Sequence, residues 1–227
     1  MSAERVVILG GHGKIALLAA PQLTAAGYAV ESVIRNPEQS GDVEAAGGTA
    51  LVLDIETATV DQLAEAFSGA QAVVFSAGAG AGNPERTRAV DFEAAVRSMD
   101  AAEQAGVKRF VIVSYSRASV DVGNLDSENS FYPYAQAKHD ADEHLRGTGL
   151  DYTILGPGML TMEPATGQIR LAASDGSLDG RDPDGEERNT SRGNVAAVIT
   201  HVIAANAAVR QTVNFYDGDT AIADALA

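Results

Sequence analysis

The sequence predicts an α/β fold built on a doubly wound parallel sheet, and three observations lead to that prediction. Short apolar, β-branched runs alternate with longer alanine-rich stretches of helical periodicity. Most of the helical stretches end at a glycine, a residue that favours helix termination. The first apolar run leads directly into a glycine-rich turn. Strands separated by helices in this way form parallel sheets, and right-handed crossovers place helices on both faces.

Six strands are predicted in the first two thirds of the chain. The first of them is almost continuously apolar, as expected for a strand that helices cover on both faces. The predicted strands are Arg5–Leu9, Ala29–Ile34, Thr49–Leu53, Gln71–Phe75, Lys108–Val113 and Asp151–Leu155.

Five helices are predicted between these strands. Pro84 suits a first helical turn, because the backbone N–H that proline lacks is unpaired there in any helix. The predicted helices are Gly13–Ala26, Glu38–Ala46, Val60–Phe67, Pro84–Ala105 and Tyr132–Arg146. The glycines that close them are Gly27, Gly47, Gly69, Gly106 and Gly147.

The pattern changes after Pro157. Ser191 is of the type preferred at a helix N-cap, so a further helix is predicted to begin there. The predicted elements are a strand over Gln168–Ala173, an acidic loop over Asp175–Glu187, a helix over Ser191–Asn206 and a strand over Thr212–Tyr216. We expect a single domain over residues 1–227, in which residues 1–156 form the core and residues 157–227 a small C-terminal lobe over the carboxyl edge of the sheet.

The composition excludes several classes of protein. The 227 residues include no cysteine, which excludes a disulfide framework, a thiolate metal site and a cysteine nucleophile. With 31 acidic and 16 basic residues the net charge is −15, whereas nucleic-acid binding needs a basic surface. No apolar stretch approaches the length of a membrane span, and the first apolar run is too short for a signal peptide. We expect a cytoplasmic monomer or homodimer with no membrane or nucleic-acid partner.

The glycine-rich turn indicates a dinucleotide-binding site. Gly10, Gly11, His12, Gly13, Lys14 and Ile15 connect the first strand to the first helix, and Ala16 supplies a small residue for helix–strand packing. Glycine lets the backbone approach a ligand closely, and the N-terminus of the helix attracts a pyrophosphate. Because the turn follows a first strand and opens a first helix, the context is that of a Rossmann-like cofactor site. His12 is either a cofactor ligand or a packing residue.

The end of the second strand predicts a preference for NADP(H) over NAD(H). An acid at this point binds the ribose 2′-hydroxyl of NAD, whereas an arginine binds the 2′-phosphate of NADP. The strand is followed by Arg35 and Asn36, and Arg35 lies 35 − 13 = 22 residues after Gly13. Lys14 is expected to add positive charge near the same phosphate.

Two further segments are expected to line the cofactor site. Asp54 and Ile55 follow the third strand, and Asp54 either accepts a hydrogen bond from the adenine amino group or caps the next helix. The small residues Ser76, Ala77 and Gly78 follow the fourth strand, where the backbone is expected to lie close to the adenine ribose.

Tyr134 and Lys138 are the predicted catalytic pair. They are four residues apart and so lie on one helical face. A tyrosine hydroxyl has a pKa of about 10, and a neighbouring ammonium lowers that pKa by stabilising the tyrosinate. Tyr134 can then exchange a proton while a hydride moves, and Lys138 can also reach the ribose hydroxyls of the cofactor.

With these motifs the chain resembles the short-chain dehydrogenase/reductase superfamily, in particular its compact, NmrA-like NAD(P)H-binding members. The motifs that carry the resemblance are Gly10–Ala16, Arg35-Asn36, Asp54, Phe110–Ser114, Tyr134–Lys138 and Leu150–Gly158. The resemblance implies that the turn at Pro157 and Gly158 passes the nicotinamide carboxamide. It also implies that a serine after the fifth strand polarises the acceptor carbonyl.

The chain departs from that family pattern in two places. Tyrosine follows the first serine in Ser114-Tyr115-Ser116, so Ser114 is the preferred candidate for the catalytic hydroxyl, with Ser116 and Tyr115 as alternatives. Gly156 replaces the arginine that usually precedes the Pro-Gly turn, and either leaves room near the nicotinamide or has no functional consequence.

No metal site is expected. His139, Asp140, Asp142, Glu143 and His144 crowd one helix, but no convergent third ligand is evident, so these residues are interpreted as a solvated face. Asp179, Asp182 and Asp184 lack the spacing of a calcium loop.

The leading functional hypothesis is an NADP(H)-dependent oxidoreductase that transfers hydride to a small carbonyl, quinone-like or flavin-like acceptor. The alternatives are a non-catalytic NADP(H)-binding redox sensor and a nucleotide-sugar epimerase or dehydratase. The altered serine segment favours the sensor, whereas the intact tyrosine–lysine pair favours an enzyme. The 70 residues after Pro157 are few for a sugar-nucleotide domain (227 − 157 = 70).

Overall fold

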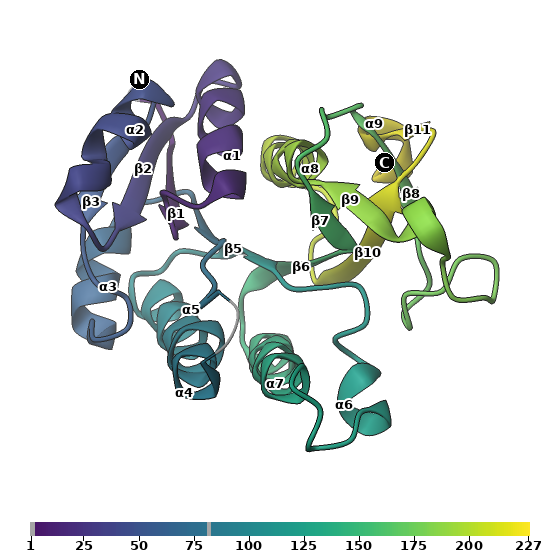
Figure 1. Cartoon of the computed structure of the whole chain (residues 1–227). Helices are drawn as coiled ribbons and strands as arrows, with labels where there is room; N and C mark the ends of the chain where they lie inside the picture. The colour runs from purple at the N-terminus through teal and green to yellow at the C-terminus, as the bar shows by residue number, and fades with distance from the viewer. Residues whose placement is uncertain (1–2, 81–82) are drawn as a thin grey trace.

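The computed structural model describes residues 3–80 and 83–227 (Figure 1). The six strands predicted before Pro157 are present with boundary shifts of two residues or fewer. They are β1 (Arg5–Leu9), β2 (Ala29–Ile34), β3 (Thr49–Val52), β4 (Ala72–Phe75), β5 (Arg109–Val113) and β6 (Asp151–Pro157).

The predicted helices are also present, and one of them is not regular. The helix predicted over 84–105 consists of α4 (Pro84–Thr87), a π-helical stretch (Arg88–Ala94) and α5 (Ala95–Gln104). Sequence periodicity did not predict the π-helical stretch or the short helix α6 (Asp121–Asn124). The others are α1 (Lys14–Ala25), α2 (Ser40–Ala45), α3 (Val60–Phe67) and α7 (Tyr132–Gly147).

The C-terminal segment contains more elements than its sequence predicts. The short strands and the last short helix carry too few residues for a periodic signal. The elements are β7 (Met159–Thr161), β8 (Gln168–Leu171), β9 (Asn189–Ser191), α8 (Arg192–Ala204), β10 (Gln211–Asp217), β11 (Thr220–Ala221) and α9 (Ile222–Ala225).

These strands confirm the Rossmann-like doubly wound sheet. Among the described residues the main sheet has nine strands in the order β11-β8-β10-β6-β5-β4-β1-β2-β3. It is parallel from β3 to β10 and antiparallel where β8 joins β10 and β11. The chain begins at β1, runs outward to β3 and returns to β4 on the other side of β1. A crevice at the carboxyl ends of β1 and β4 therefore marks the switch point where such folds bind ligands.

Two helical layers cover the sheet, as Figure 1 shows, with α1 and α8 on one face and α3, α5 and α7 on the other. Alternate strand residues supply the two cores: Val6 and Ile8 pack toward α1 and α8, whereas Val7 and Leu9 pack toward the opposite layer. Burial on both faces accounts for the continuous apolar runs that predicted the strands.

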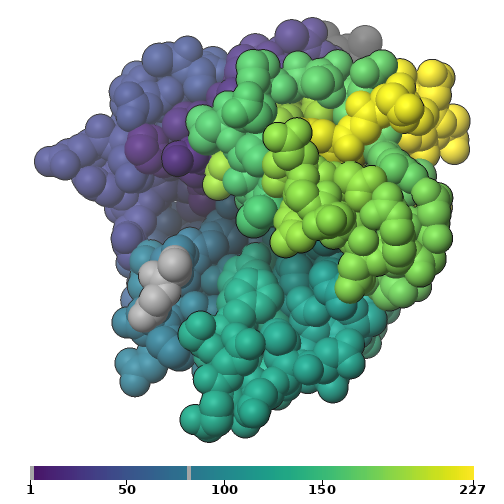
Figure 2. Space-filling model, turned by 45° about the vertical axis from the view of Figure 1, so that its right-hand side comes forward, coloured from purple at the N-terminus to yellow at the C-terminus, as the bar shows by residue number. Residues whose placement is uncertain are grey.

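The segment after Pro157 shares the main sheet with the rest of the chain. β10 extends the sheet beside β6, and α8 packs against α1. A second, two-stranded sheet of β7 and β9 lies above the carboxyl edge. Figure 2 shows this segment, green to yellow, lying against the teal segment that contains α7. No helix within residues 3–80 and 83–227 is long and apolar enough to cross a bilayer.

Arg109 connects the two parts of the molecule. Its buried guanidinium donates to Thr153 Oγ1 at 2.8 Å and to the carbonyls of Val202 at 3.0 Å and Ala207 at 2.9 Å. Burial lowers the pKa of Arg109 to about 10. One side chain on β5 thus binds β6, the last turns of α8 and the loop that follows it.

Candidate functional site

Three neighbouring cavities lie at the carboxyl ends of the parallel strands. The glycine-loop cavity, about 360 Å³, is bounded by Gly10–Gly13, Arg35 and Ser76–Gly78. The central cavity, about 880 Å³, shares Ser76–Gly78 with it and reaches Tyr134 and Lys138. The arginine-lined cavity, about 950 Å³, lies beyond Tyr134 and takes its name from Arg117, Arg188 and Arg192. Together they form a path from the switch point to the C-terminal segment.

Two glycines of the turn are required by packing rather than by ligand approach. Gly10 has a φ of +78°, and a Cβ on it would lie 2.7 Å from the Cα of Ala77. A Cβ on Gly11 would lie 2.5 Å from the Cβ of Ser32. The turn therefore fits between β2 and the segment after β4, which brings it to the switch point.

Gly13 is the glycine that leaves the helix N-terminus open. It is the N-cap of α1, is exposed, and has no side chain to accept a hydrogen bond from the first turn. The first-turn N–H groups can therefore bind an anion. His12 lines the same cavity and contacts Asp42 Oδ2 through Nε2 at 2.8 Å. Lys14 is exposed and lines none of the three cavities, whereas Ile15 lines the central one.

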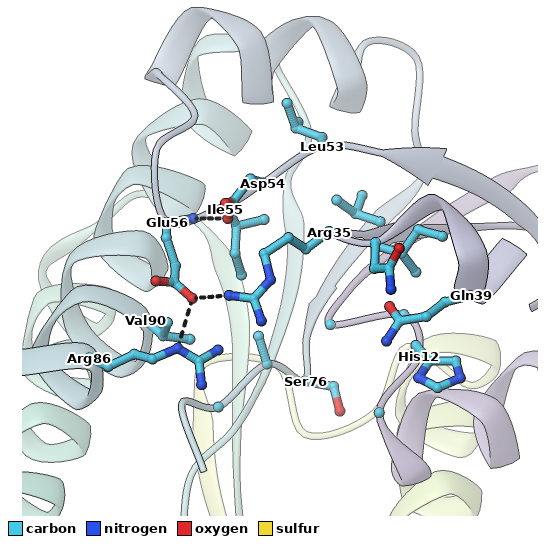
Figure 3. A pocket seen from close by; sticks show the side chains of 18 residues that line it. His12, Arg35, Gln39, Leu53, Asp54, Ile55, Glu56, Ser76, Arg86 and Val90 are labelled. Carbon is cyan, nitrogen blue, oxygen red and sulfur yellow. Dashed lines mark hydrogen bonds and ion pairs between the residues drawn. The ribbon is translucent and has the colours of Figure 1, made fainter. Parts of the chain in front are cut away.

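Figure 3 shows two arginines that converge on one carboxylate in the glycine-loop cavity. Arg35 Nη1 donates to Glu56 Oε1 at 2.8 Å, and Arg86 Nε donates to the same oxygen at 3.0 Å. Arg86 Nη1 also donates to the carbonyl of Ala79 at 2.7 Å. The two guanidiniums share one carboxylate oxygen and keep further N–H donors, which suits a phosphate.

The segment after β3 is held by backbone contacts. Asp54 Oδ1 accepts from the backbone N–H of Glu56 at 3.0 Å, so Asp54 stabilises a turn. The next helix is capped by Thr59 and not by Asp54. Arg97 Nη2 donates to the carbonyls of Ile55 at 2.9 Å and Glu56 at 3.0 Å, which fixes the loop from α5. Asp54, Ile55 and Asn36 all line the glycine-loop cavity, as predicted.

A buried ion pair fixes Lys138 in the central cavity. Lys138 Nζ donates to the carbonyl of Val113 at 2.8 Å and lies 3.5 Å from Asp91 Oδ1. Both side chains are at most 4% exposed. Burial lowers the pKa of Lys138, but Asp91 and Tyr134 together raise it by more than burial lowers it. The pKa therefore lies above its ordinary value, and the ammonium is charged. Asp91 Oδ2 also accepts from the N–H of Ala79, beside the Ser76–Gly78 segment.

Tyr134 lies on the same face of α7 and has a raised pKa. Burial raises the pKa of its hydroxyl above 10.0, and Lys138 only partly offsets this effect. The expected lowering of the pKa by Lys138 is therefore present, but burial outweighs it, and Asp91 and Asp142 add to the effect of burial. At neutral pH Tyr134 carries its proton.

Ser114 is directed at a second buried acid. Its Oγ donates to Asp142 Oδ2 at 2.7 Å, and Asp142 is 2% exposed. Burial raises the pKa of Asp142 to about 6, although the Ser114 hydrogen bond and Lys138 lower it. The interpretation of Asp142 as part of a solvated face was wrong. Asp142 follows Lys138 by four residues, as Lys138 follows Tyr134, so the three side chains lie on one face of the helix. Glu143, on another face, is exposed.

The two alternatives to Ser114 line the arginine-lined cavity but not the central one. Ser116 Oγ accepts from the Tyr216 hydroxyl at 3.1 Å. The Tyr115 ring packs on Tyr134, and burial raises the pKa of its hydroxyl. Ser114 borders both the central and the arginine-lined cavity and directly follows Val113, whose carbonyl accepts from Lys138.

The Pro-Gly turn borders the arginine-lined cavity through Pro157 and Gly158. Gly156 does not provide room for a ligand. A Cβ on it would lie 2.1 Å from Asn214 Oδ1 and 3.2 Å from the Cα of Ser116, so the missing side chain accommodates β10. Asn214 is itself held through Nδ2 by the carbonyls of Ala173 and Ser174.

Several residues of the site had no prediction attached to them, including the three arginines of the arginine-lined cavity. Arg86, Glu56 and Asp91 come from segments whose direction at the sheet edge the sequence does not specify. Phe131 lines two cavities from the loop before α7. Asp142 alone had a usable signal, because it continues the four-residue spacing of the catalytic pair.

A family model described as NAD(P)H-binding matches residues 10–206 of the chain. The match includes the glycine turn, the arginine–glutamate cluster, the tyrosine–lysine pair and α8.

Similar proteins extend over almost the whole chain. The Bacillus subtilis protein named as an uncharacterized sugar epimerase, YhfK, is 33% identical over 88% of this chain and 87% of its own length. A Bacillus halodurans structure assigned to the NAD-dependent epimerases/dehydratases is 29% identical with a TM-score of 0.85 and covers 98% of both chains. The oxidoreductase ylbE of Lactococcus lactis is 27% identical with a TM-score of 0.79, over 96% of this chain and 93% of ylbE.

Proposed function

The chain belongs to the NAD(P)H-binding family, and from that premise we propose that it is an NADPH-dependent oxidoreductase that reduces a small carbonyl, quinone-like or flavin-like acceptor. The observation that carries the proposal is the placement of Tyr134 and Ser114 where the central and arginine-lined cavities meet, with Lys138 beside them in the central cavity. A site that only senses a cofactor has no need of a proton donor beside a second cavity.

The residues of the glycine-loop cavity fit a dinucleotide with a 2′-phosphate. The open N-terminus of α1 would hold the pyrophosphate, and Arg35 with Arg86 would hold the 2′-phosphate. Neither Asp54 nor Glu56 is free for a ribose diol: one stabilises a turn and the other pairs with the arginines. We therefore propose NADP(H) in preference to NAD(H).

The protein supplies a proton donor and an oriented lysine. When bound, NADPH supplies a hydride to the acceptor carbon. Tyr134 donates its hydroxyl proton to the acceptor oxygen, so that the carbonyl becomes an alcohol, and its raised pKa keeps that proton in place beforehand. Lys138 uses one N–H on Val113 and faces Asp91 with another, which leaves one for a ribose hydroxyl of the cofactor.

Calorimetric titration with NADPH and NADH tests the cofactor assignment. We expect tighter binding of NADPH, and we expect Arg35→Ala to weaken NADPH by about tenfold while leaving NADH unchanged, as for the loss of a charge-assisted phosphate contact. Arg170→Ala is the matched control, because Arg170 pairs with Asp179 outside the three cavities. Equal affinities for the two cofactors would refute the preference.

Steady-state oxidation of NADPH with a quinone such as menadione tests the chemistry. Tyr134→Phe is expected to lower kcat by 100-fold or more, on the order of a lost general acid, with NADPH affinity unchanged. Phe fits the same apolar neighbours Tyr115 and Phe131, so folding is not at issue. Indifference to Tyr134→Phe would favour the redox-sensor hypothesis.

A sugar-epimerase activity is the second candidate, because YhfK carries that name. An epimerase returns the hydride to its substrate and consumes no cofactor overall. Incubation with UDP-glucose and NAD⁺ or NADP⁺, which would accept the first hydride, separates the two proposals: formation of a second sugar nucleotide without net change in the cofactor would support the epimerase and refute the reductase.

A further inference from the structure

The arginine-lined cavity has the position of a second-substrate site, an inference that rests on the proposed function. It shares no lining residue with the glycine-loop cavity. It meets the central cavity at Ser114, Phe131, Tyr134 and Leu160. A dinucleotide that followed the glycine turn would reach Lys138 through the central cavity. The Pro157–Gly158 turn, which is expected to pass the nicotinamide, borders the arginine-lined cavity, so the cofactor would end at its rim and the rest of that cavity would remain for the acceptor.

Three aromatic rings form one wall of this cavity. The ring centroids of Tyr115 and Phe131 are 5.6 Å apart at an interplanar angle of 84°. Tyr134 lies 5.5 Å from Tyr115 and 5.2 Å from Phe131. Phe131 is 42% exposed and Met159, another lining residue, is 58% exposed, so large apolar surfaces are left uncovered at the cavity. Such surfaces suit a flat conjugated ring.

Arg192 gives the cavity a cation with unused donors. It follows Ser191, the N-cap of α8, and its Nη1 donates to the carbonyls of Leu160 and Thr161, at 3.0 Å each. Those bonds fix the guanidinium but use only two of its five N–H groups. Within residues 3–80 and 83–227 no carboxylate pairs with Arg192, and its remaining donors make no hydrogen bond.

The other two arginines of the cavity already have acidic partners. Arg117 binds Asp121 at 3.0 Å and Asp182 at 2.8 Å. Arg188 lies 3.6 Å from Asp184. In a chain of net charge −15, an anionic ligand needs a local cation that acids of the protein do not neutralise, and Arg192 meets that condition.

We propose that the arginine-lined cavity binds a planar, conjugated acceptor that carries a carboxylate. The carboxylate binds the free N–H groups of Arg192, and the ring packs on Tyr115 and Phe131. Arg192 thereby determines specificity: it selects acidic acceptors and sets how far the ring extends toward Tyr134.

A matched ligand pair, 2-naphthoate and the neutral 2-naphthamide, tests the proposal by calorimetry in the absence and presence of saturating NADP⁺. The wild-type protein is expected to bind the naphthoate at least tenfold more tightly than the amide, as a charge-assisted contact provides. In Arg192→Gln that ratio should fall to about one, with the affinity for the amide unchanged.

Two control variants separate charge from packing. Arg188→Gln is expected to keep most of the ratio, because Arg188 already has an acidic partner. Phe131→Leu should weaken both ligands by the same factor and leave the ratio intact. The ratio of the two affinities is taken within each protein. A disturbance of β7 by Arg192→Gln would change both affinities and would therefore cancel from the ratio.

Equal wild-type affinities for the two ligands, binding of neither, or an unchanged ratio in Arg192→Gln would each overturn the proposal. A separate NADPH titration of the same preparations keeps the two proposals apart. Lost naphthoate selectivity with intact NADPH binding refutes only the acidic acceptor. Absence of NADPH binding refutes the proposed function, and the naphthoate and naphthamide affinities still test the anion site.

Discussion

At the scale of single residues, Glu56 controls the charge of the glycine-loop cavity. One of its carboxylate oxygens accepts from both Arg35 and Arg86. The Glu56 side chain is 23% exposed and that of Arg35 is 56% exposed, so solvent weakens the pairs without removing them. The acid both orients the arginines and competes with any phosphate for their N–H groups.

Glu56→Gln should therefore strengthen NADPH binding. The amide still accepts hydrogen bonds but removes the competing negative charge, and we expect a gain of roughly threefold, the scale of a solvent-screened ion pair. NADH affinity should not change, and calorimetry measures both. Glu44→Gln, an exposed acid on α2 outside the cavity, is the control. A weaker NADPH complex in Glu56→Gln would mean that orientation of the arginines outweighs their charge.

The buried Asp142 leads to a second prediction at the residue scale: the stability of the protein depends on pH through this group. Burial raises its pKa from 3.8 to about 6 in the folded protein. Below the lower value both the folded and unfolded states carry the proton. As pH rises through this window the unfolded chain ionises first, so the free energy of unfolding falls, by roughly 3 kcal/mol for this group.

Asp142→Asn removes that dependence while it keeps an acceptor for Ser114. The difference in unfolding free energy, variant minus wild type, should rise by roughly 3 kcal/mol between about pH 4 and pH 7. Urea denaturation at several pH values measures it, and the contributions of other groups cancel in the difference. Asp140→Asn, on the same helix but partly exposed, is the control variant. A flat curve for Asp142→Asn would show that its carboxylate is not disfavoured by burial.

At the scale of elements, the π-helical stretch Arg88–Ala94 places an acid against α7. Asp91 lies within this stretch, 1% exposed, and faces Lys138 across the central cavity. π-Helical turns widen a helix locally and often occur at functional sites. Here the local change of pitch coincides with Asp91, the residue that pairs with Lys138.

Asp91→Ala should destabilise the protein strongly, because Lys138 would remain buried without its partner. We expect a loss of about 3–5 kcal/mol in unfolding free energy, measured by urea denaturation. Glu93→Gln is the control: Glu93 pairs with Arg88 on the exposed side of the same stretch, and its loss should cost less than about 1 kcal/mol. Similar small losses in both variants would show that Lys138 finds another partner or water.

At the scale of the whole molecule, the C-terminal segment completes the core. α8 supplies Val195, Val198 and Ile199 to the layer that covers β1 and α1. β10 pairs with the edge of β6, and Arg109 on β5 donates to Thr153 of β6 and to the carbonyl of Val202 in α8. Neither part can bury its apolar surface without the other.

Residues 1–156 alone should therefore not form a stable fold. Truncation would expose the α1 layer and the edge of β6, and we expect poor dispersion of amide resonances and no cooperative thermal transition. The full chain should unfold in one transition by both near-UV and far-UV circular dichroism. Two separate transitions in the full chain, or a folded 1–156 fragment, would contradict the prediction of one domain.

Much of the fold and part of the site could be predicted because their signals are local. A strand buried on both faces is apolar throughout, and a helix closed by glycine shows that glycine in the sequence. The site motifs are short-range patterns as well: the glycine turn, Arg35 and the spacing of Tyr134 and Lys138. From such patterns the parallel sheet, the order of its elements along the chain and the NAD(P)H cofactor class could be predicted.

Which residues contact each other across the site depends on the tertiary structure. Arg86 reaches Glu56 over 30 positions of sequence, and Ser114 reaches Asp142 over 28. Gly156 makes room for Asn214 on a strand far along the chain. Such contacts depend on the relative placement of packed elements, which many different sequences satisfy, so no local pattern specifies them. The arginine-lined cavity, whose lining residues run from Ser114 to Tyr216, depends on contacts of this kind.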